Sequence, residues 1–430
     1  MAEMMDLAED KADPAEEIRI TFLFMGQGDC VLISCPDGKR ILVDAGSTGN
    51  FGQTEWLRAH MMLRSDDGVG KRGGLDALIL THPDLDHCNQ IANMLLGAKI
   101  EATTLDGEEV KAQTTSAIPV NEVYFSAGSV DDKSPLAEYA KSGASDTIYN
   151  LLGVKRLHLV RLNATTSSVR TWKWDAEGKP AEDTQLDAGE MVVASGTTAT
   201  KKRAWKVRII AGCVAKSGID QSDTLGRNAR SLVTLLELGT EKALLCGDAT
   251  ASTERFLVAS RKALISDVVL LQAPHHGSSR TSSTPEFVGA VKPKSVAVSV
   301  DLIEYSHHLP GRAAIDLYLA TVLDVGSHKI DAWQRDPRFQ KGTTNQANTE
   351  LDRWRTTGVR IEQRQSKVDD EPVSEGPHYI RADQEDVENV FVALSPAEGY
   401  LCYRASSTKD IQLTGLTGQV DYLTYALNGE

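Results

Sequence analysis

The 430-residue sequence lacks several features that mark large classes of proteins. It contains no run of 18 apolar residues, the length that a membrane-spanning helix needs, and its first 17 residues are acidic where a secretory leader is basic and then apolar. Its six cysteines form neither a CxxC pair nor a dense framework, which is typical of reduced thiols. We therefore expect a protein of the cytoplasm with no membrane segment.

Positive charge is also scarce, because 46 Lys and Arg stand against 60 Asp and Glu, a net charge of −14. Nonspecific binding of nucleic acid depends on neutralising phosphates with basic side chains, so a surface-wide attraction to nucleic acid is excluded. Any such contact must be local. The candidates are the run Lys201 to Arg203 and the pair Arg227 and Arg230, for which a solvated charged face is the alternative.

The apolar fraction of 41% is ordinary for a globular protein, and short strand-like runs alternate with turns from residue 18 onward. Pro36-Asp37-Gly38 between two such runs is a hairpin signal. Strands return from Trp205, with a helix between Ser252 and Leu264. Strands, a helix and further strands predict the α+β class, as a sandwich of two sheets with helices outside.

The strength of these signals divides the chain into regions. We predict an acidic N-terminal tail at 1–17 and a catalytic domain at 18–330. Strand signals weaken between 98 and 203, which indicates an elaborated insertion in that domain. A C-terminal extension at 331–430 is expected to complete the fold in part.

Histidine is scarce as well, yet six of the ten histidines fall in three tight clusters close behind strand-like runs. The first cluster is HPDLDH at 82–87, a pattern expected by composition in about one of a thousand chains of this length. Imidazole and carboxylate groups bind Zn, Mn or Fe, and four of them in six residues can be divided between two ions. A purely structural role would leave buried charges unpaired, at a cost of several kcal/mol each.

Two further segments can complete such a site. Asp248 ends the apolar run of LLCGDAT, and a carboxylate can bridge two cations, although a Gly-Asp at a strand end alone is more often a turn or helix cap. His275 and His276 follow another strand, which fits a metal ligand beside a proton donor. His307 or His308 would complete the site or protonate a leaving group, unless both are ordinary surface residues.

Seven segments in this order resemble the metallo-β-lactamase fold, and more closely the branch found in the soluble domain of ComEC competence proteins and in related phosphodiesterases. The segments are MGQGDCVLI, PDGKRILVDAGS, LTHPDLDHC, NARSLVTLL, LLCGDAT, PHHGSS and YSHHLP. The likeness covers about residues 18–318. It implies an αββα sandwich and a dinuclear metal hydrolase of phosphodiester substrates.

The resemblance implies two divalent cations and assigns a set of ligands. The implied ligands are His82, Asp84, Asp86, His87, Asp248 and His276. Asp29 and Asp44 would orient the site from outside this set. Asp84 stands where the fold usually has His, and this harder oxygen ligand makes Mn a competitor of Zn.

The fold commonly supplies one more His before the bridging Asp, and here only His158 lies in that interval, without a strand-end context. Asn228 and Ser231 stand in its place, so water or His307 would finish the coordination. Alternatively, Asn228 and Arg227 contact substrate phosphate, because guanidinium groups match phosphate oxygens. We count Ser231 and Ser278 among the substrate-binding candidates.

In this hypothesis two cations about 3.5–4 Å apart hold a bridging hydroxide that attacks phosphorus. Asp86, His275 and His307 are the catalytic candidates, with His275 or His307 protonating the departing oxygen. The leading prediction is a nuclease acting on DNA through local contacts, held in check by a regulatory protein partner or by self-association, in bacterial defence. The alternatives are a hydrolase of a small phosphodiester, ester or lactone, and a catalytically silent metal-binding interaction module.

Overall fold

The computed structural model of the protein describes a defined set of residues, and every structural statement concerns these residues. The described residues are 3–6, 15–23, 25, 28–47, 74–91, 95, 104–105, 108–109, 118–126, 154–164, 167–174, 180–186, 188–214, 223–299, 313–314, 317–318, 321, 330–332, 355–356, 361–364, 367–368, 371–372, 379–382, 390–395, 399–404, 420–427 and 429. Within these ranges, no helix has the length and apolar character needed to cross a membrane.

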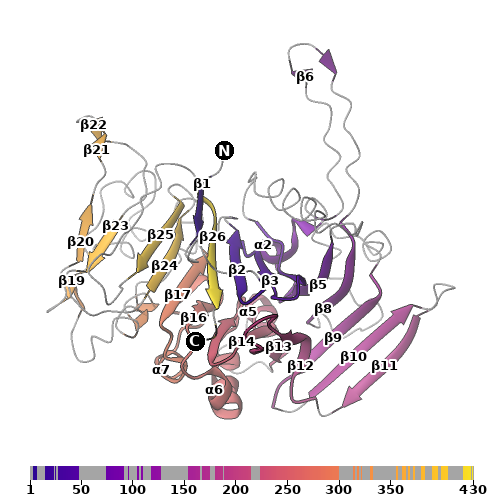
Figure 1. Ribbon diagram of the computed structural model, residues 1–430. Helices are drawn as coiled ribbons and strands as arrows, with labels where there is room; N and C mark the ends of the chain where they lie inside the picture. The colour runs from indigo at the N-terminus through magenta and orange to yellow at the C-terminus, as the bar shows by residue number, and fades with distance from the viewer. Residues whose placement is uncertain are drawn as a thin grey trace.

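The first of two large sheets contains most strands of the N-terminal half (Figure 1). In spatial order they are β1 (Glu3–Asp6), β26 (Val420–Leu427), β2 (Ile18–Leu23), β3 (Val31–Ser34), β4 (Arg40–Val43), β5 (Leu75–Leu80), β8 (Val120–Phe125), β9 (Arg156–Leu162), β10 (Ser167–Trp174) and β11 (Pro180–Leu186). β2, β3 and β4 form the antiparallel meander that the hairpin signal predicts. β4 and β5 are parallel, so the loops that follow them lie at one edge of the sheet.

The second sheet contains most strands of the later part. Its order is β12 (Met191–Thr197), β13 (Ala204–Ala211), β14 (Val233–Leu238), β15 (Glu241–Leu245), β16 (Leu270–Gln272), β17 (Ser295–Ser299), β24 (Val390–Ser395) and β25 (Gly399–Arg404). β15, β16 and β17 are parallel neighbours, which brings the segments after each of them to a common edge. The chain from 331 onward thus adds β24 and β25 to this sheet and β26 to the first.

Helices and short strand pairs complete the described structure. The helices are α2 (Leu85–Cys88), α5 (Asp223–Asn228), α6 (Ala251–Ile265), α7 (Pro285–Val291) and the 3₁₀ turn η3 (Pro274–Gly277). The small strand pairs are β6 (Thr104–Leu105) with β7 (Glu108–Glu109), β18 (Ile330–Ala332) with β19 (Arg355–Thr356), β20 (Ile361–Arg364) with β23 (Tyr379–Ala382), and β21 (Lys367–Val368) with β22 (Glu371–Pro372).

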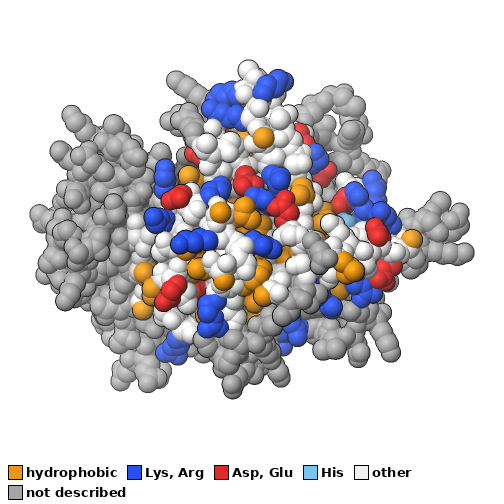
Figure 2. Space-filling view, turned by 90° about the horizontal axis from the view of Figure 1, so that it is seen from below, with side chains coloured by type: hydrophobic (Ala, Val, Ile, Leu, Met, Phe, Trp, Pro, Cys, Tyr) orange, Lys and Arg blue, Asp and Glu red, His pale blue; other side chains and the backbone are white. Residues whose placement is uncertain are grey.

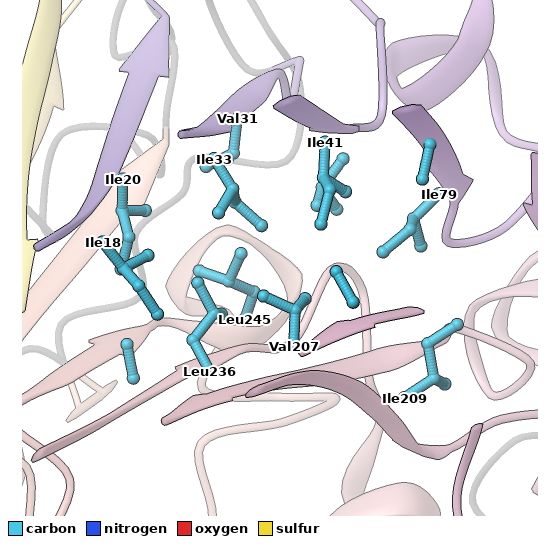
Figure 3. Close-up of a cluster of buried hydrophobic side chains, with 14 of the residues drawn as sticks. Ile18, Ile20, Val31, Ile33, Ile41, Ile79, Val207, Ile209, Leu236 and Leu245 are labelled. Atoms are coloured by element: carbon cyan, nitrogen blue, oxygen red, sulfur yellow. The ribbon is translucent and has the colours of Figure 1, made fainter. Parts of the chain in front are cut away.

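The core forms three apolar layers that hold these elements together. Between the two sheets, residues such as Ile20, Ile33 and Ile79 face Val207 and Leu236 (Figure 3). A second layer packs α6 and α7 against the outer face of the second sheet, and a third lies on the other face of the first sheet beside α2. The arrangement is the predicted αββα sandwich, and the prediction of the α+β class is confirmed.

Individual strands were predicted with uneven success. The strands predicted to return from Trp205 are present from β13 onward, and the helix predicted between Ser252 and Leu264 is present as α6. β10, β11 and β12 lie in the stretch where the sequence signals are weak. The side chains that the structure describes in β11 are all exposed, so this strand has none of the apolar alternation by which a strand is recognised.

Glu254 makes the junction of α6 and α7 sensitive to pH. Burial raises the pKa of Glu254 to about 7, although the backbone N–H groups of Ser283 and Thr284 donate hydrogen bonds to its carboxylate. A carboxyl pKa above its unfolded value of 4.5 contributes stability below pH 4.5 and loses that contribution as the pH rises through 7. We expect the free energy of unfolding to fall by an amount on the order of 3 kcal/mol between pH 5 and 8.

Urea unfolding in EDTA at both pH values measures this change without a contribution from bound metal. Glu254→Gln cannot ionise, so its unfolding free energy is expected to vary less between pH 5 and 8 than that of the wild type. An equal pH dependence in the two proteins would contradict the assignment to Glu254.

Candidate metal centre

Three chain segments that follow β5, β15 and β16 meet where these strands of the two sheets end. The loop after β5, together with α2, contributes His82, Asp84, Asp86 and His87. Asp248 lies in the turn after β15, and His275 and His276 lie in η3 directly after β16. Parallel strands of the two sheets therefore bring the separate histidine clusters together, as the sequence predicts for 82–87, 248 and 276.

Asp248 lies at the centre of the group, and each of its two oxygens faces a different set of side chains. Its Oδ1 is 3.1 Å from His87 Nε2 and 3.3 Å from His276 Nε2. His276 Nε2 is also 3.7 Å from Asp86 Oδ2. We call the space among these atoms the Oδ1 pocket.

The other oxygen of Asp248 faces a second set. Its Oδ2 is 3.6 Å from His82 Nε2 and 3.6 Å from His275 Nε2. His82 Nε2 is 3.7 Å from Asp84 Oδ2. We call this space the Oδ2 pocket.

The spacing of these atoms suits cation ligands. A tetrahedral ion with bonds of about 2.0–2.2 Å places neighbouring ligand atoms about 3.4 Å apart. The distances across the two pockets run from 3.1 to 3.7 Å. The Asp248 carboxylate therefore lies between two sets of atoms that are spaced as metal ligands are, and around Oδ1 the ligand atoms of four residues lie within 4.8 Å of one another.

Missing hydrogen bonds point the same way. Five buried atoms of this cluster have no hydrogen-bond partner among the described residues: His82 Nε2, His87 Nε2, His276 Nε2, Asp248 Oδ1 and Asp29 Oδ1. A buried polar atom without a partner costs about 1–3 kcal/mol, and more when it is charged. A cation would satisfy these lone pairs, so the residues present fit a metal centre.

The histidines are held by their other ring nitrogens. His87 Nδ1 is 2.8 Å from Asp44 Oδ2, and His276 Nδ1 is 2.9 Å from the carbonyl oxygen of Ser299. His82 Nδ1 lies near the hydroxyls of Thr81 and Ser231, at 3.2 and 3.3 Å. These contacts leave Nε2 of each ring to face Asp248, the arrangement typical of metal-binding histidines.

Asp44 is placed for this task by its own backbone. It has a φ of 58°, and its carboxylate accepts hydrogen bonds from Thr81 N and Thr81 Oγ1 at 2.7 and 2.6 Å. A positive φ is uncommon for a residue with a Cβ, and strained backbone of this kind clusters at functional sites, although it also occurs elsewhere in this chain. This position agrees with the predicted orienting role.

The electrostatic balance of the cluster depends on oppositely charged neighbours. Burial alone would raise the pKa of Asp248, but the charges of His276, His87 and His275 hold it well below its usual value. Burial would lower the pKa of His87, but the Asp248 and Asp44 carboxylates raise it well above its usual value. The site is therefore built to hold positive charge next to Asp248.

Asp29 lies closer to the cluster than its predicted orienting role requires. Ligand atoms of Asp29, His87, Asp248 and His276 all lie within 4.8 Å of one another, and the four residues are buried. Burial raises the pKa of Asp29, against the opposing charges of His276 and His87. This carboxylate is near enough to serve as a further ligand of the Oδ1 pocket.

Residues around 228, predicted to bind substrate, occupy different positions. Arg227 donates from Nε to Asp84 Oδ1 at 2.5 Å, and its side chain is 41% exposed. Asn228 is buried, with Nδ2 3.4 Å from Asp248 Oδ2 and 3.1 Å from His275 Nε2. Ser231 is fully buried under His82, so it orients that ring and is out of reach of a bound substrate.

Four other candidates lie apart from the pockets or outside the described residues. Ser278 is buried, and its hydroxyl accepts from Thr281 Oγ1 at 2.8 Å, so its binding of substrate stays a prediction. His158 contacts Thr171 and Glu122 through its two ring nitrogens. His307 and His308 lie outside the described residues.

Some contacts of the site were not predicted. Thr81 directly precedes the ligand loop, and its adjacency to His82 is the one sequence signal that could have found it. Thr281, which contacts His275 Nδ1 at 2.7 Å, lies shortly after the HHGSS segment, and no known sequence motif marks a threonine at that position. The carbonyl of Ser299 is a backbone group, and no residue type marks it.

Comparison with known protein families supports the fold that the two sheets show. The family model of the metallo-β-lactamase superfamily matches residues 23–99. The fold is the metallo-β-lactamase fold. The matched stretch includes the HPDLDH segment at 82–87, whereas Asp248 and the paired histidines of η3 lie beyond it.

Solved structures with weak similarity include two proteins. One is Zn²⁺-bound PqqB from Methylobacterium extorquens, 11% identical, with a TM-score of 0.30 over 59% of this chain and 71% of that one. The other is CmlA, a diiron β-hydroxylase from Streptomyces venezuelae, 15% identical, with a TM-score of 0.35 over 72% of this chain and 52% of that one. A comparison with curated proteins found no match.

Proposed function

We propose that this protein is a dinuclear metal-dependent phosphodiesterase that hydrolyses nucleic acid. The observation that carries the proposal is the placement of Asp248, whose two oxygens each face a separate set of ligand atoms at 3.1–3.6 Å. One carboxylate shared by two pockets is the arrangement found at two-metal hydrolytic sites.

The side chains would divide the work as follows. His82 and Asp84 would hold a cation with Asp248 Oδ2, and Asp86, His87 and His276 would hold the other with Asp248 Oδ1. Two such cations activate water and stabilise charge on phosphoryl oxygens. Because this chemistry supplies the nucleophile, no serine or cysteine nucleophile is needed, and Cys88 and Cys246 are buried packing residues.

Charge distribution supports an anionic substrate. Residues 188–299 contain 15 Lys and Arg against 9 Asp and Glu, although the whole chain has a net charge of −14. Lys and Arg side chains are spread over the described part of the lower face, to which α6 and α7 belong (Figures 1 and 2). Arg255, Lys262, Lys292 and Lys294 are exposed on or beside these helices. A local basic surface fits nucleic acid better than it fits a neutral ester or lactone.

Sequence motifs support DNA among the nucleic acids. The segments NARSLVTLL, LLCGDAT and PHHGSS resemble the ComEC branch, which is linked to degradation of one DNA strand. The aspartate at 84 is shared with that branch and favours Mn alongside Zn.

A substrate panel tests the proposal. Metal-free protein is reconstituted with Mn²⁺ or Zn²⁺ and incubated with single-stranded, duplex and circular DNA, RNA and bis-p-nitrophenyl phosphate. We expect hydrolysis of a phosphodiester that is lost in EDTA and restored by added metal. Full metal occupancy without hydrolysis of any phosphodiester would refute the proposal and favour a silent binding module, whereas cleavage of the small diester alone would refute the nucleic-acid assignment.

Arg227→Ala is expected to raise KM for DNA about tenfold and to flatten the dependence of binding on salt. The physical reason is that its half-exposed guanidinium lies beside Asp84, where it can contact a phosphate at the mouth of the Oδ2 pocket. Lys155→Ala, which removes an exposed positive charge just before β9 and outside the basic stretch 188–299, is the matched control and should change KM little. Equal effects of the two variants on KM, measured at two salt concentrations, would contradict a specific role for Arg227.

A further inference from the structure

The paired histidines of η3 pose a question about how the Oδ2 pocket is completed. We propose that His275 is a ligand of that pocket, so that His275 and His276 bind one cation each. The inference rests on the proposed dinuclear site and extends it. It replaces the assignment of His275 as the donor of a proton to the leaving group.

His275 is held through Nδ1 as the other three histidines of the cluster are, although its Nε2 also contacts the Asn228 amide. In His82, His87 and His276, Nδ1 contacts a hydroxyl, a carboxylate or a carbonyl of the scaffold, and Nε2 faces Asp248. His275 Nδ1 is 2.7 Å from Thr281 Oγ1, and its Nε2 is 3.6 Å from Asp248 Oδ2. The distance to Asp248 equals that of His82, which is an implied ligand.

Hydrogen bonds also fix the proton of His275 on Nδ1. Asn228 Nδ2 lies 3.1 Å from His275 Nε2, and because an amide NH₂ only donates, Nε2 must carry the lone pair. The Nδ1–H group then donates to Thr281 Oγ1, and Thr281 donates to Ser278 Oγ at 2.8 Å. The lone pair of Nε2 therefore points into the cluster, where it accepts from Asn228, and a cation bound there would take the place of this hydrogen bond.

The backbone of η3 also holds both histidines in an uncommon conformation. His275 and His276 both have positive φ, 50° and 52°, a conformation that side chains with a Cβ rarely adopt, and here two such residues are adjacent. The result is that the two rings are 6.2 Å apart and inclined by 69°, with one Nε2 near each oxygen of Asp248. A single ligand would need only one of these residues to be held in this way.

Two consequences follow for the Oδ2 pocket. His82, Asp84, Asp248 and His275 supply it with four ligand atoms, so the absence of a histidine at the place of Asn228 leaves no gap. Asn228 then has the role of a positioning residue, since its amide also lies 3.4 Å from Asp248 Oδ2. The proton for the leaving group must come from another donor.

Metal binding tests the inference directly. Metal-free wild type and His275→Ala are titrated with Mn²⁺ and Zn²⁺ by calorimetry, and bound metal is counted by mass spectrometry after gel filtration. The wild type should hold two ions, and His275→Ala should hold one, with the affinity of the second ion reduced at least about 100-fold. Titration with Co²⁺ should show an altered visible spectrum only for the second equivalent.

Two further variants keep the result interpretable. Thr281→Val removes the acceptor for Nδ1–H and should weaken the second ion about tenfold while both ions still bind. His158→Gln changes a buried histidine whose described contacts lie outside the cluster, and it should bind both ions as the wild type does. Circular dichroism confirms that each variant is folded.

The outcomes separate this inference from the proposed function. Two ions bound with wild-type affinities in both His275→Ala and Thr281→Val would overturn the assignment of His275 and leave the dinuclear phosphodiesterase standing. A wild type that holds two ions but hydrolyses no phosphodiester would refute the function and leave the ligand assignment standing. A wild type that binds fewer than two ions overturns both.

Discussion

Asp248→Ala is expected to abolish binding of both cations and to lower kcat/KM for a phosphodiester by at least about 10³-fold. The reason is that both pockets depend on this one carboxylate, which contacts His87 and His276 through Oδ1 and His82 through Oδ2. The variant also removes the negative charge beside which these histidines are placed. Metal content after gel filtration and steady-state kinetics with bis-p-nitrophenyl phosphate measure the two effects.

Asp248→Asn is the matched control, because it keeps the size of the side chain but leaves one neutral oxygen. It should retain one weakly bound ion at most, since an amide NH₂ cannot act as the second ligand atom. Asp37→Asn, in the exposed hairpin between β3 and β4, should leave metal content and rate unchanged. If Asp248→Ala held two ions as tightly as the wild type, the shared-carboxylate site would be wrong.

The sequence correctly predicted that several residues lie together. Each of these residues stands in a short segment that is rich in potential metal ligands or follows an apolar strand. Four potential ligands within HPDLDH, and paired histidines after an apolar strand, can be recognised without a structure because each segment is local. The structure brings His82, His87, Asp248 and His276 into one buried group. Their roles in catalysis stay predictions until metal and activity are measured.

What the sequence could not give are the contacts that only the fold creates. Ser231 was predicted to bind substrate. However, it lies two residues before β14, and its hydroxyl is buried against His82 Nδ1. The contact between the Ser299 carbonyl oxygen and His276 Nδ1 forms only because β17 lies beside β16. Similarly, β11 was not predicted because its side chains are polar and exposed and show no apolar alternation. Only its backbone pairing with β10 makes it a strand.

Gly46→Ala is expected to disrupt the metal centre although position 46 bears no ligand. Gly46 follows Asp44 in the loop after β4, and a Cβ there would lie 1.8 Å from the carbonyl oxygen of Asp86 and 2.3 Å from His87 N. These are backbone atoms of the ligand helix α2, so rotating a side chain cannot relieve the clash. The loop also cannot retreat freely, because Gly46 N donates to Asp29 O and Ala45 N donates to His87 O.

The two backbones must therefore move apart, and the ligands of α2 must move with them. We expect a loss of unfolding free energy on the order of 1–3 kcal/mol and a fall in kcat/KM of about 100-fold, the effect of a displacement near 1 Å at a catalytic group. Urea unfolding of metal-free protein measures the first, and kinetics at saturating metal measure the second. Gly189→Ala is the control, because a Cβ at Gly189 meets nothing within 4 Å. Equal stability and activity of the two variants would show that α2 does not depend on close contact with Gly46, and that the ligand loop is held by other means.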